Sequence, residues 1–485
     1  MPSVINISPV TRVEGHLDVE VTVETVRGRQ EVIDARATAP MFRGFERILV
    51  GRDPLDAVHY TQRVCGVCPI AHAMASSLAL ENAFGITPTE NGRIMRNLIL
   101  GANFIQSHIL HFYHLAAPDY INTTGILDMS PWKPRFTVSD MVTGPVAATL
   151  VGHYVQALEM RRKAHQMGAI FAGRMPTTAS FVPGGTSETV TASAVSSFRA
   201  LLTELRAFIN NVYIPDGSAV MAAFPEYMEL GRGCGNLLAY GVFDLNAAGT
   251  SKLLKRGRYT AGADGTVDAS QIKEYVAHSW FAASSGDLNP AVGVTEPNAD
   301  KAGGYSWIKA PRYQDTVHEV GPLARMWVNG DYRAGVSTMD RILARALEAR
   351  KVADAMDGWL NQLVPGGVVY KPSTTPVTAV GIGLTEAARG ALGHWVGIGA
   401  QKISRYQMVT PTGWNASPRD DMEQLGALEQ ALLGTPVADA AQPVEVLRVV
   451  HSFDPCLACS VHLVHPGPKA RRLATVQAGL TQAAY

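Results

Sequence analysis

The sequence predicts a multidomain α+β protein, with a mainly helical core bundle around a metal site and small α+β domains beside it. Three observations predict this class. Apolar residues recur at helical spacing over several long stretches, a segment rich in Gly and Pro with short strands interrupts them, and two Cys-x-x-Cys pairs stand near opposite ends of the chain. A chain of 485 residues has room for a large buried core.

The composition excludes several classes of protein. Lys plus Arg and Asp plus Glu both number 42, so no basic surface for nucleic acid or anionic membrane is expected. No uncharged apolar run reaches about 18 residues, which predicts no transmembrane helix. Residues 1–6 lack the charged and apolar regions of a signal peptide, and five cysteines are too few for a disulfide-stapled secreted protein.

The N-terminal half predicts one hairpin followed by long helices. Apolar and polar residues alternate over 16–26, and 27–29 turns the chain into a second strand over 32–38. Glu14 precedes this hairpin, where a solvated strand-end carboxylate is the simplest interpretation. Pro69 is well placed at a helix start, and apolar faces predict helices over 69–85, 91–115, 145–167 and 191–213.

The C-terminal half is less regular. Residues 215–325 predict an irregular α+β segment, with a charged hairpin over 255–267 around Asp264 and Gly265. Ser337 or Thr338 can cap a helix to Leu363. The remaining predictions are a turn region at 385–395, a helix at 422–433, a strand at 444–451 and a tail at 463–485 without a core pattern.

The expected domain organisation follows these changes of pattern. An N-terminal α+β hairpin region (1–60) precedes a helical core with the first Cys pair (61–214). The irregular segment (215–330), a helical and C-terminal region with the second Cys pair (331–462) and a C-terminal extension (463–485) complete the chain.

The cysteine pairs carry the strongest chemical signal. Cys65 and Cys68 are followed by His72, and Cys456 and Cys459 by His462. Two such pairs can enclose a metal in soft thiolate ligands, and a helix N-terminus favours the thiolate. A redox dithiol is the alternative for one pair and zinc for two.

Other candidate groups have simpler interpretations. The spacing of His108, His111 and His114 resembles a metal pattern, but their aromatic neighbours favour core histidines. Cys234 lies in a Gly-rich loop and is expected to be inert. The glycines around it match no dinucleotide fingerprint, and no phosphate-binding loop motif occurs.

Residues 63–72 and 454–462 resemble the two signature motifs of the large subunit of nickel–iron hydrogenases. The resemblance extends over the chain up to His462 and is greatest to the membrane-bound uptake group. Further matching stretches are 12–16, 42–46, 111–115, 319–325, 389–395 and 414–420.

This resemblance implies a nickel ion held by four thiolates, two of which bridge to an iron that carries carbon monoxide and two cyanides. Cys65 and Cys456 then resemble the terminal nickel ligands, and Cys68 and Cys459 the bridges. A buried anionic centre needs a counter-charge. The resemblance assigns that role to Arg389, held in place by Asp454, with Thr412 as a hydrogen-bond donor to cyanide and His72 beside the cofactor.

The resemblance also implies the reaction, oxidation of H2 to two protons and two electrons, reversible in principle. Cys456 resembles the first proton acceptor and Glu14 the next. Glu46, the carbonyl of Met408 and His462 resemble a magnesium site. Val67 and Leu115 match residues of a gas tunnel, whereas Pro69, Ala388 and Ser107 depart from the commoner pattern.

Partners follow from what the chain lacks. Only Cys234 remains outside the two pairs, so electrons are expected to leave through an iron–sulfur small subunit, in a heterodimer or a dimer of heterodimers. The resemblance adds nickel-insertion factors and a maturation protease that removes 463–485. A partner's export signal would place the enzyme at the periplasmic side of a membrane, with the cytoplasm as the alternative.

Three other functions stay open at this level. A hydrogen-sensing regulatory subunit would use the same site. A quinone-reductase subunit would share the fold but lack the cysteine pairs, and a zinc-stabilised protein would need only the pairs.

Overall fold

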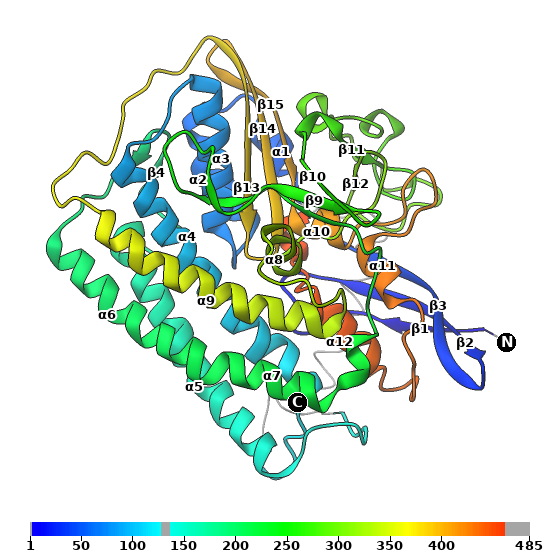
Figure 1. Cartoon of the computed structure of the whole chain (residues 1–485). Coiled ribbons are helices and arrows are strands. Elements are labelled where there is room, and N and C mark those ends of the chain that lie inside the picture. The colour runs from blue at the N-terminus through cyan, green and yellow to red at the C-terminus, as the bar shows by residue number, and fades with distance from the viewer. Residues whose placement is uncertain (1, 128–135, 461–485) are drawn as a thin grey trace, which may run out of the picture.

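The computed structural model describes residues 2–127 and 136–460, except for the side chains of 459 and 460. A bundle of long helices fills one side of the molecule, and sheets with short helices fill the other (Figure 1). The bundle consists of α4 (Glu90–Leu110), α5 (Gly144–Ala172), α6 (Ala192–Phe208), α7 (Ile214–Ala223) and α9 (Thr338–Gln362). Helices and sheets thus combine as the predicted α+β class requires.

Side-chain caps set where the bundle helices begin. Thr89, Thr191 and Ser337 each accept a hydrogen bond from a backbone N–H in the first turn of α4, α6 and α9. The predicted end of the helical region near Pro215 is wrong, because α6 runs through a π-turn into α7. Pro215 lies in the first turn of α7, directly after the π-turn Ile209–Tyr213, and does not end the helix there.

A three-stranded antiparallel sheet packs against one helix outside the bundle. It contains β13 (Thr378–Ala387), β14 (Gly390–Gly399) and β15 (Lys402–Val409), and α3 (Pro69–Phe84) lies across β13. A Cβ at Gly383 would lie 2.0 Å from the Ala75 carbonyl, so glycine permits this close packing. The predicted turn region at 385–395 is therefore wrong. The turn is confined to Ala388 and Arg389, because the glycines belong to strands under a helix.

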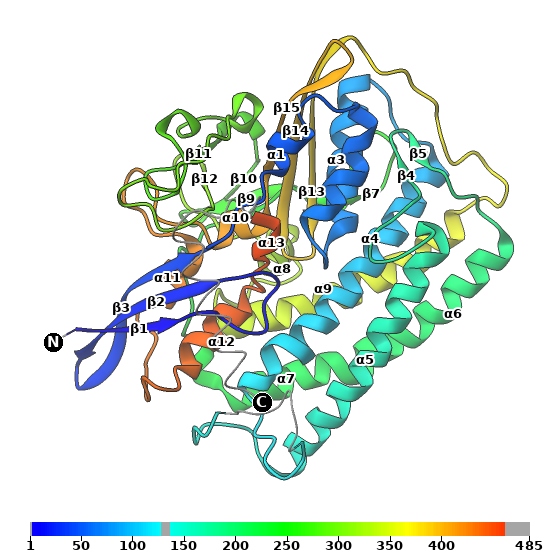
Figure 2. The same cartoon turned by 180° about the vertical axis from the view of Figure 1, so that it is seen from behind.

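The predicted N-terminal hairpin is confirmed. It is formed by β2 (Asp18–Val26) and β3 (Arg29–Thr38), and β1 (Ser3–Ile7) adds a third antiparallel strand at the edge of β2 (Figure 2). The helix α11 (Ala427–Leu432) packs on β3 and is shorter than the predicted 422–433. Residues 444–451 form the helix α12 (Val444–Ser452), not a strand. Its valines favour a strand by propensity, but burial on all sides suits a helix.

The segment 215–325 is irregular and short-stranded after α7, as predicted. The turn of the hairpin at 257–265 lies at Ala261 and Gly262 and not at Asp264. The strands are β6 (Leu237–Ala239), β7 (Val242–Asp244), β8 (Lys252–Leu254), β9 (Gly257–Thr260), β10 (Ala263–Gly265), β11 (Ile272–Tyr275) and β12 (Ala310–Tyr313).

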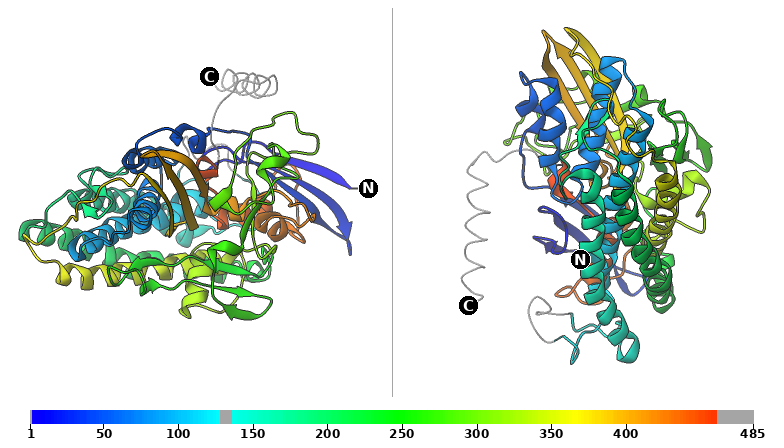
Figure 3. Two further views of the ribbon diagram at one scale, coloured as in Figure 1. Left: turned by 90° about the horizontal axis from the view of Figure 1, so that it is seen from above. Right: turned by 90° about the vertical axis from the view of Figure 1, so that its left-hand side faces the viewer.

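The remaining short elements surround the centre of the molecule. They are α1 (Phe45–Leu49), α2 (Ala57–Thr61), β4 (Phe181–Val182), β5 (Gly185–Thr186), α8 (Pro322–Asn329), α10 (Pro411–Asn415) and α13 (Leu457–Ser460). Viewed from above, the long helices lie toward one end of the molecule and the N-terminal sheet lies at the other (Figure 3). Among the described residues, none of the helices has the length and apolar character needed to cross a bilayer.

Candidate metal centre

Three cysteines from opposite ends of the chain meet in the interior. The sulfur atoms of Cys65, Cys68 and Cys456 all lie within 4.8 Å of one another, and all three residues are buried. Cys65 Sγ and Cys456 Sγ are 3.3 Å apart, well beyond a disulfide bond of about 2.05 Å. Two thiolates that bind one ion at about 2.3 Å each are separated by such a distance. The geometry fits a shared soft metal.

The first pair lies at a helix start, as the sequence predicts. Cys68 is the N-cap of α3, and the backbone N–H groups of Val67 and Cys68 point at Cys65 Sγ from 3.3 and 3.2 Å. Two amides and the positive end of the helix dipole stabilise a thiolate at Cys65.

The second pair is held by α10 and by the N-terminal segment. Thr412 Oγ1 accepts a 2.9 Å hydrogen bond from the backbone N–H of Cys456, and residue 456 pairs with Glu14 in a short parallel bridge. Cys459 lies in α13, but its side chain and all of His462 lie outside the described residues.

A buried ion pair faces the thiols. Arg389, in the turn between β13 and β14, places Nη2 2.9 Å from Asp454 Oδ1, and both side chains are 1% exposed. Nη1 donates a 3.3 Å hydrogen bond to Ser107 Oγ. Burial alone would lower the pKa of Arg389, but the negative charge of Asp454 and of the three cysteines raises it well above its ordinary value. The site is thus built to hold a negatively charged group.

Glu14 approaches the thiols from the surface side. Its Oε1 lies 3.5 Å from the backbone N–H of Gly66, between the two cysteines of the first pair. Burial, and then the charge of Cys65, raises the pKa of Glu14. A half-buried carboxyl beside the cysteines can therefore accept a proton more readily than a solvated one.

His72 lies about one turn along α3 from Cys68 and is fully buried. Its Nδ1 lies 3.1 Å from His394 Nε2, and His394 Nδ1 lies 2.8 Å from Tyr406 Oη. The other ring nitrogen of His72, Nε2, is buried and has no hydrogen-bond partner among the described residues. Burial lowers the pKa of His72 to about 4, which keeps the ring neutral. An orphaned buried nitrogen near the thiols fits a bound group at this centre.

Two other predicted histidines are core residues. His108 Nε2 lies 2.8 Å from Glu348 Oε2, and His111 Nε2 lies 2.6 Å from the carbonyl of His451. Burial lowers the pKa of both. His114 packs against Tyr154 with ring centroids 4.5 Å apart. Val67 and Leu115, the two residues that match a gas tunnel in the sequence, are both half-buried.

Glu46 lies in a separate polar pocket. Its Oε1 accepts a 2.8 Å hydrogen bond from the backbone N–H of Met408, and Thr295 donates to its Oε2. A cavity of about 30 Å³ lies beside this carboxylate. It is lined by Glu46, Met408, Glu274 and Lys309. Burial, and then the charge of Glu46, raises the pKa of Glu274 to about 7 against the effect of Lys309. Two buried carboxyls around a small cavity fit a hard cation.

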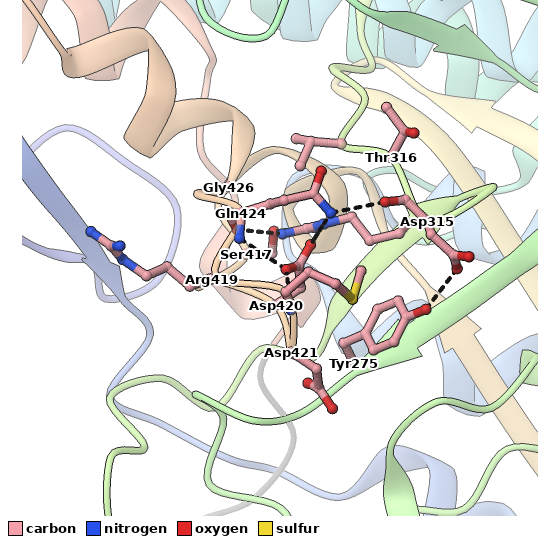
Figure 4. Close-up of polar contacts among 12 residues, drawn as sticks. Tyr275, Asp315, Thr316, Ser417, Arg419, Asp420, Asp421, Gln424 and Gly426 are labelled. Atoms are coloured by element: carbon pink, nitrogen blue, oxygen red, sulfur yellow. Dashed lines mark hydrogen bonds and ion pairs between the residues drawn. The ribbon is translucent and has the colours of Figure 1, made fainter.

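A hydrogen-bonded loop follows α10 and fixes that helix. Asp420 accepts hydrogen bonds from the backbone of Met422 and from both the backbone and side chain of Gln424, all 2.9–3.0 Å long (Figure 4). The buried Arg312 donates a 2.6 Å hydrogen bond to the same carboxylate. Asp420 therefore ties this loop together and fastens it to Arg312.

The sequence missed several residues around these sites. Thr295, Lys309 and Gln407 surround Glu46, and Lys309 Nζ lies 3.0 Å from Gln407 Oε1 and 3.4 Å from Glu274 Oε2. They come from the irregular segment and from β15 and share no local pattern. A charged residue within an apolar stretch, such as Lys309 after Trp307 and Ile308, is the one signal that could have indicated them.

Comparisons with known proteins agree with this geometry. Residues 43–143, 138–335 and 328–462 match a family model described as nickel-dependent hydrogenase, and 4–36 match one described as HoxL-like. The chain is 45% identical to the periplasmic [NiFeSe] hydrogenase large subunit of Desulfomicrobium baculatum, over 95% of each chain. It is 33% identical to the hydrogenase-1 large chain of Escherichia coli (strain K12), over 97% of this chain and 96% of that one.

An uptake hydrogenase large subunit, from Bradyrhizobium diazoefficiens, is 34% identical over 95% of both chains. Among solved structures, the H2-activated [NiFeSe]-hydrogenase of Dm. baculatum matches with a TM-score of 0.91 at 45% identity, over 95% of this chain and all of that chain. The reduced Ni-Fe-Se hydrogenase from D. vulgaris Hildenborough matches with a TM-score of 0.91 at 43% identity, with the same coverage.

Proposed function

The chain belongs to the nickel-dependent hydrogenase family, and from this premise we propose how its residues perform the reaction. It is a hydrogenase large subunit, an oxidoreductase that oxidises H2 to two protons and two electrons. The relatives described above are named as enzymes, which supports turnover over the alternative of a regulatory hydrogen sensor. The three buried thiols beside the Arg389–Asp454 pair carry the proposal.

Cys65, Cys68, Cys456 and Cys459 would hold the nickel–iron centre, whose iron in this proposal carries carbon monoxide and two cyanides. When bound, this centre supplies the redox-active Lewis acid that splits H2 heterolytically. All four ligand positions are cysteine, so the site uses sulfur although some relatives are named as selenium-containing. Thiolates and cyanides make the centre anionic, and the buried guanidinium of Arg389 offsets that charge.

The proton leaves by way of Cys456 and Glu14. Cys456 Sγ would hold the first proton released at this centre, the role that the family resemblance gives it; it belongs to the three-thiol cluster, and residue 456 is bridged to Glu14 through the backbone. The Glu14 carboxyl accepts it next and passes it toward the surface. Thr412 fixes the backbone of Cys456, and His72 directs a neutral nitrogen toward the bound group.

Glu46 and the carbonyl of Met408, with His462, bind a magnesium ion. The support is the small cavity lined by Glu46, Met408 and Glu274, in which the carboxyl groups are buried. Oxygen ligands and room for water suit Mg²⁺. Chelation followed by Mg²⁺ addition should lower and then restore the Tm, and Glu46→Gln should abolish this response. An unchanged Tm in the wild type would rule the magnesium site out.

The partner is an iron–sulfur small subunit, in a heterodimer or a dimer of heterodimers, because one cysteine remains beyond the four ligands. A partner's export signal carries the complex to the periplasmic side of a membrane, in line with the periplasmic relative. Nickel-insertion factors load the site, and a protease then removes 463–485.

Infrared spectroscopy and metal analysis of the anaerobically purified complex test the proposal. Bands of metal-bound carbon monoxide and cyanide, about one nickel per chain, and H2-dependent dye reduction are expected. Zinc in place of nickel and iron, without such bands in matured protein, would refute it. An intact mass that includes 463–485 in nickel-loaded active protein would refute the processing step alone.

A further inference from the structure

Helix α9 presents three charged side chains to the interior. Arg341, Arg345 and Glu348 are spaced at four and three residues, so they share one face of the helix, and each is at most 3% exposed. Burying three charges is costly unless each is paired, and such networks are weak evidence for stability alone.

Two of these side chains hold the segment that ends in Asp454. Arg345 Nη2 donates a 3.3 Å hydrogen bond to the carbonyl of Ser452, two residues before Asp454. The Arg341 guanidinium lies 3.8 Å from the ring centroid of Phe453, the residue between them. Arg341 is itself fixed by two hydrogen bonds of 2.8 and 2.7 Å to Glu319. The α9 face therefore sets the backbone position from which Asp454 reaches Arg389.

The third side chain holds the turn that carries Arg389, through Arg325. Arg325 Nε and Nη2 each donate a 2.6 Å hydrogen bond to Glu348. The remaining donors reach Glu386 Oε2 at 2.8 Å and the carbonyls of Ala387 and Ala388 at 3.0 and 2.8 Å. All five N–H groups of the guanidinium are thus engaged. Two of them fasten the two residues directly before Arg389.

The turn is also fixed from its other side. A Cβ at Gly321 would lie 3.2 Å from the Arg389 carbonyl, and a Cβ at Gly390 would lie 2.5 Å from Val320 Cγ2. Both glycines have φ values of +135° and +141°, which favour glycine, so the backbones of the two segments touch. Asn415 clamps Val320 with two 2.9 Å hydrogen bonds, and Asn415 is on α10 with Thr412.

We propose that Arg325, Arg345 and Glu348 are positioning residues that hold the Arg389–Asp454 pair in register over the thiols. Asp454 is tied to α9 through the hydrogen bond between Arg345 and Ser452. Arg389 is tied to α9 through Arg325, which binds both Glu348 and the residues before Arg389. Helix α9 acts as a rigid frame between them. This proposal deepens the proposed function, and it concerns the placement of Arg389 rather than contact with the cofactor.

The decisive variant is Arg325→Lys in the full complex. Lysine keeps the charge between Glu348 and Glu386 but has three donors at one point, so it cannot also hold both carbonyls. We expect the Arg389 side chain to move away from Asp454 in a crystal structure of the variant. The kcat per bound nickel should fall roughly 10- to 100-fold with KM unchanged, because a displacement near 1 Å is costly at a reacting centre.

Asp354→Asn is the matched control. Asp354 lies on the exposed side of α9 and pairs with Arg206 at 2.7 Å, so its loss removes an ion pair of the same helix without touching the turn. The control should keep the wild-type structure around Arg389 and the wild-type kcat per nickel.

A purely structural role makes different predictions. It would lower the Tm and the nickel content of Arg325→Lys while Arg389 stays in place and kcat per nickel is unchanged, and that result overturns the proposal. Should Arg325→Lys fail to fold, Glu348→Gln takes its place: the amide leaves one of the two Arg325 donors without an acceptor, and the position of Arg389 and the kcat per nickel are read in the same way. An inactive, nickel-free wild type would refute the proposed function, whereas the crystallographic position of Arg389 in the variants still tests the positioning.

Discussion

The backbone N–H of Leu457 donates a 2.7 Å hydrogen bond to the carbonyl of Glu14. This contact joins the first strand region to the second cysteine motif. Arg43 reinforces it, because its guanidinium donates to the carbonyls of Val64 and Ala458, one in each motif. The thiol cluster is therefore complete only when the two ends of the chain have met.

Gly15 lies at the closest point of this junction. Its φ is +81°, and a Cβ there would lie 2.5 Å from the backbone nitrogen of Ala458. Gly15→Ala should separate the two ends and reduce bound nickel, measured by metal analysis of the purified complex. Gly28→Ala is the control, since Gly28 has φ +83° and no atom within 4 Å of its Cβ position. It should cost only the backbone strain of about 1–2 kcal/mol and keep the nickel. Equal nickel loss in both variants would contradict the junction.

The cysteines should separate into two classes on substitution. Cys65→Ser and Cys456→Ser each remove a soft ligand from the buried cluster, so nickel and H2-dependent dye reduction should be lost. Cys234→Ser should retain both, because Cys234 Sγ instead lies 3.5 Å from the carbonyl of Asn236, in the loop before β6. Nickel retained by Cys456→Ser would exclude Cys456 as a ligand.

Glu14→Gln should block proton exit and leave the metals in place. The amide keeps the size of the side chain and the backbone contacts of residue 14, but it cannot carry a proton onward. H2 oxidation per nickel should fall about 100-fold or more, with nickel content and infrared bands unchanged. Glu24→Gln, on β2 and away from the thiols, should match the wild type. Loss of metal from Glu14→Gln would show instead that Glu14 is structural.

Much of the fold could be predicted because its signals are local. Pro69 and Ser337 start helices where first-turn chemistry indicates, and the alternation at 16–26 defines a strand. Two of the errors, at 385–395 and 444–451, share one cause, which is tertiary packing that overrides propensity. The valines of α12 are buried on all sides, and the glycines of β13 and β14 lie under α3.

The residues of the candidate site also fall into two groups, those that sequence motifs reveal and those that only the folded chain brings together. The cysteines, Arg389 and Glu14 lie in motifs whose resemblance to a family can be seen in the sequence. The partners of Arg325 cannot be seen there, because Glu348 and Glu386 come from a separate helix and strand and meet it only in the folded chain. The same holds for Lys309 beside Glu46, since neither residue has a local pattern that requires the other.

Glu348 also makes the fold sensitive to acid. Burial alone would raise its pKa, but the charge and hydrogen bonds of Arg325, together with His108, hold the pKa down to about 2 from an ordinary 4.5. The folded state thus binds fewer protons than the unfolded state between these values. The stabilisation is present above pH 4.5 and is lost as the pH falls toward 2. Glu348→Gln should therefore reduce the acid-induced loss of stability in that window, because its side chain does not titrate.

The same variant should be less stable at neutral pH by about 3–5 kcal/mol, since it leaves the buried Arg325 incompletely paired. Thermal unfolding of wild type and Glu348→Gln between pH 2 and 7 measures both effects. Asp354→Asn, on the exposed side of the same helix, should follow the wild-type pH profile with a small offset. Parallel profiles of Glu348→Gln and the wild type would mean that folding does not shift the pKa of Glu348. Arg325 would then not stabilise the Glu348 carboxylate in the folded protein.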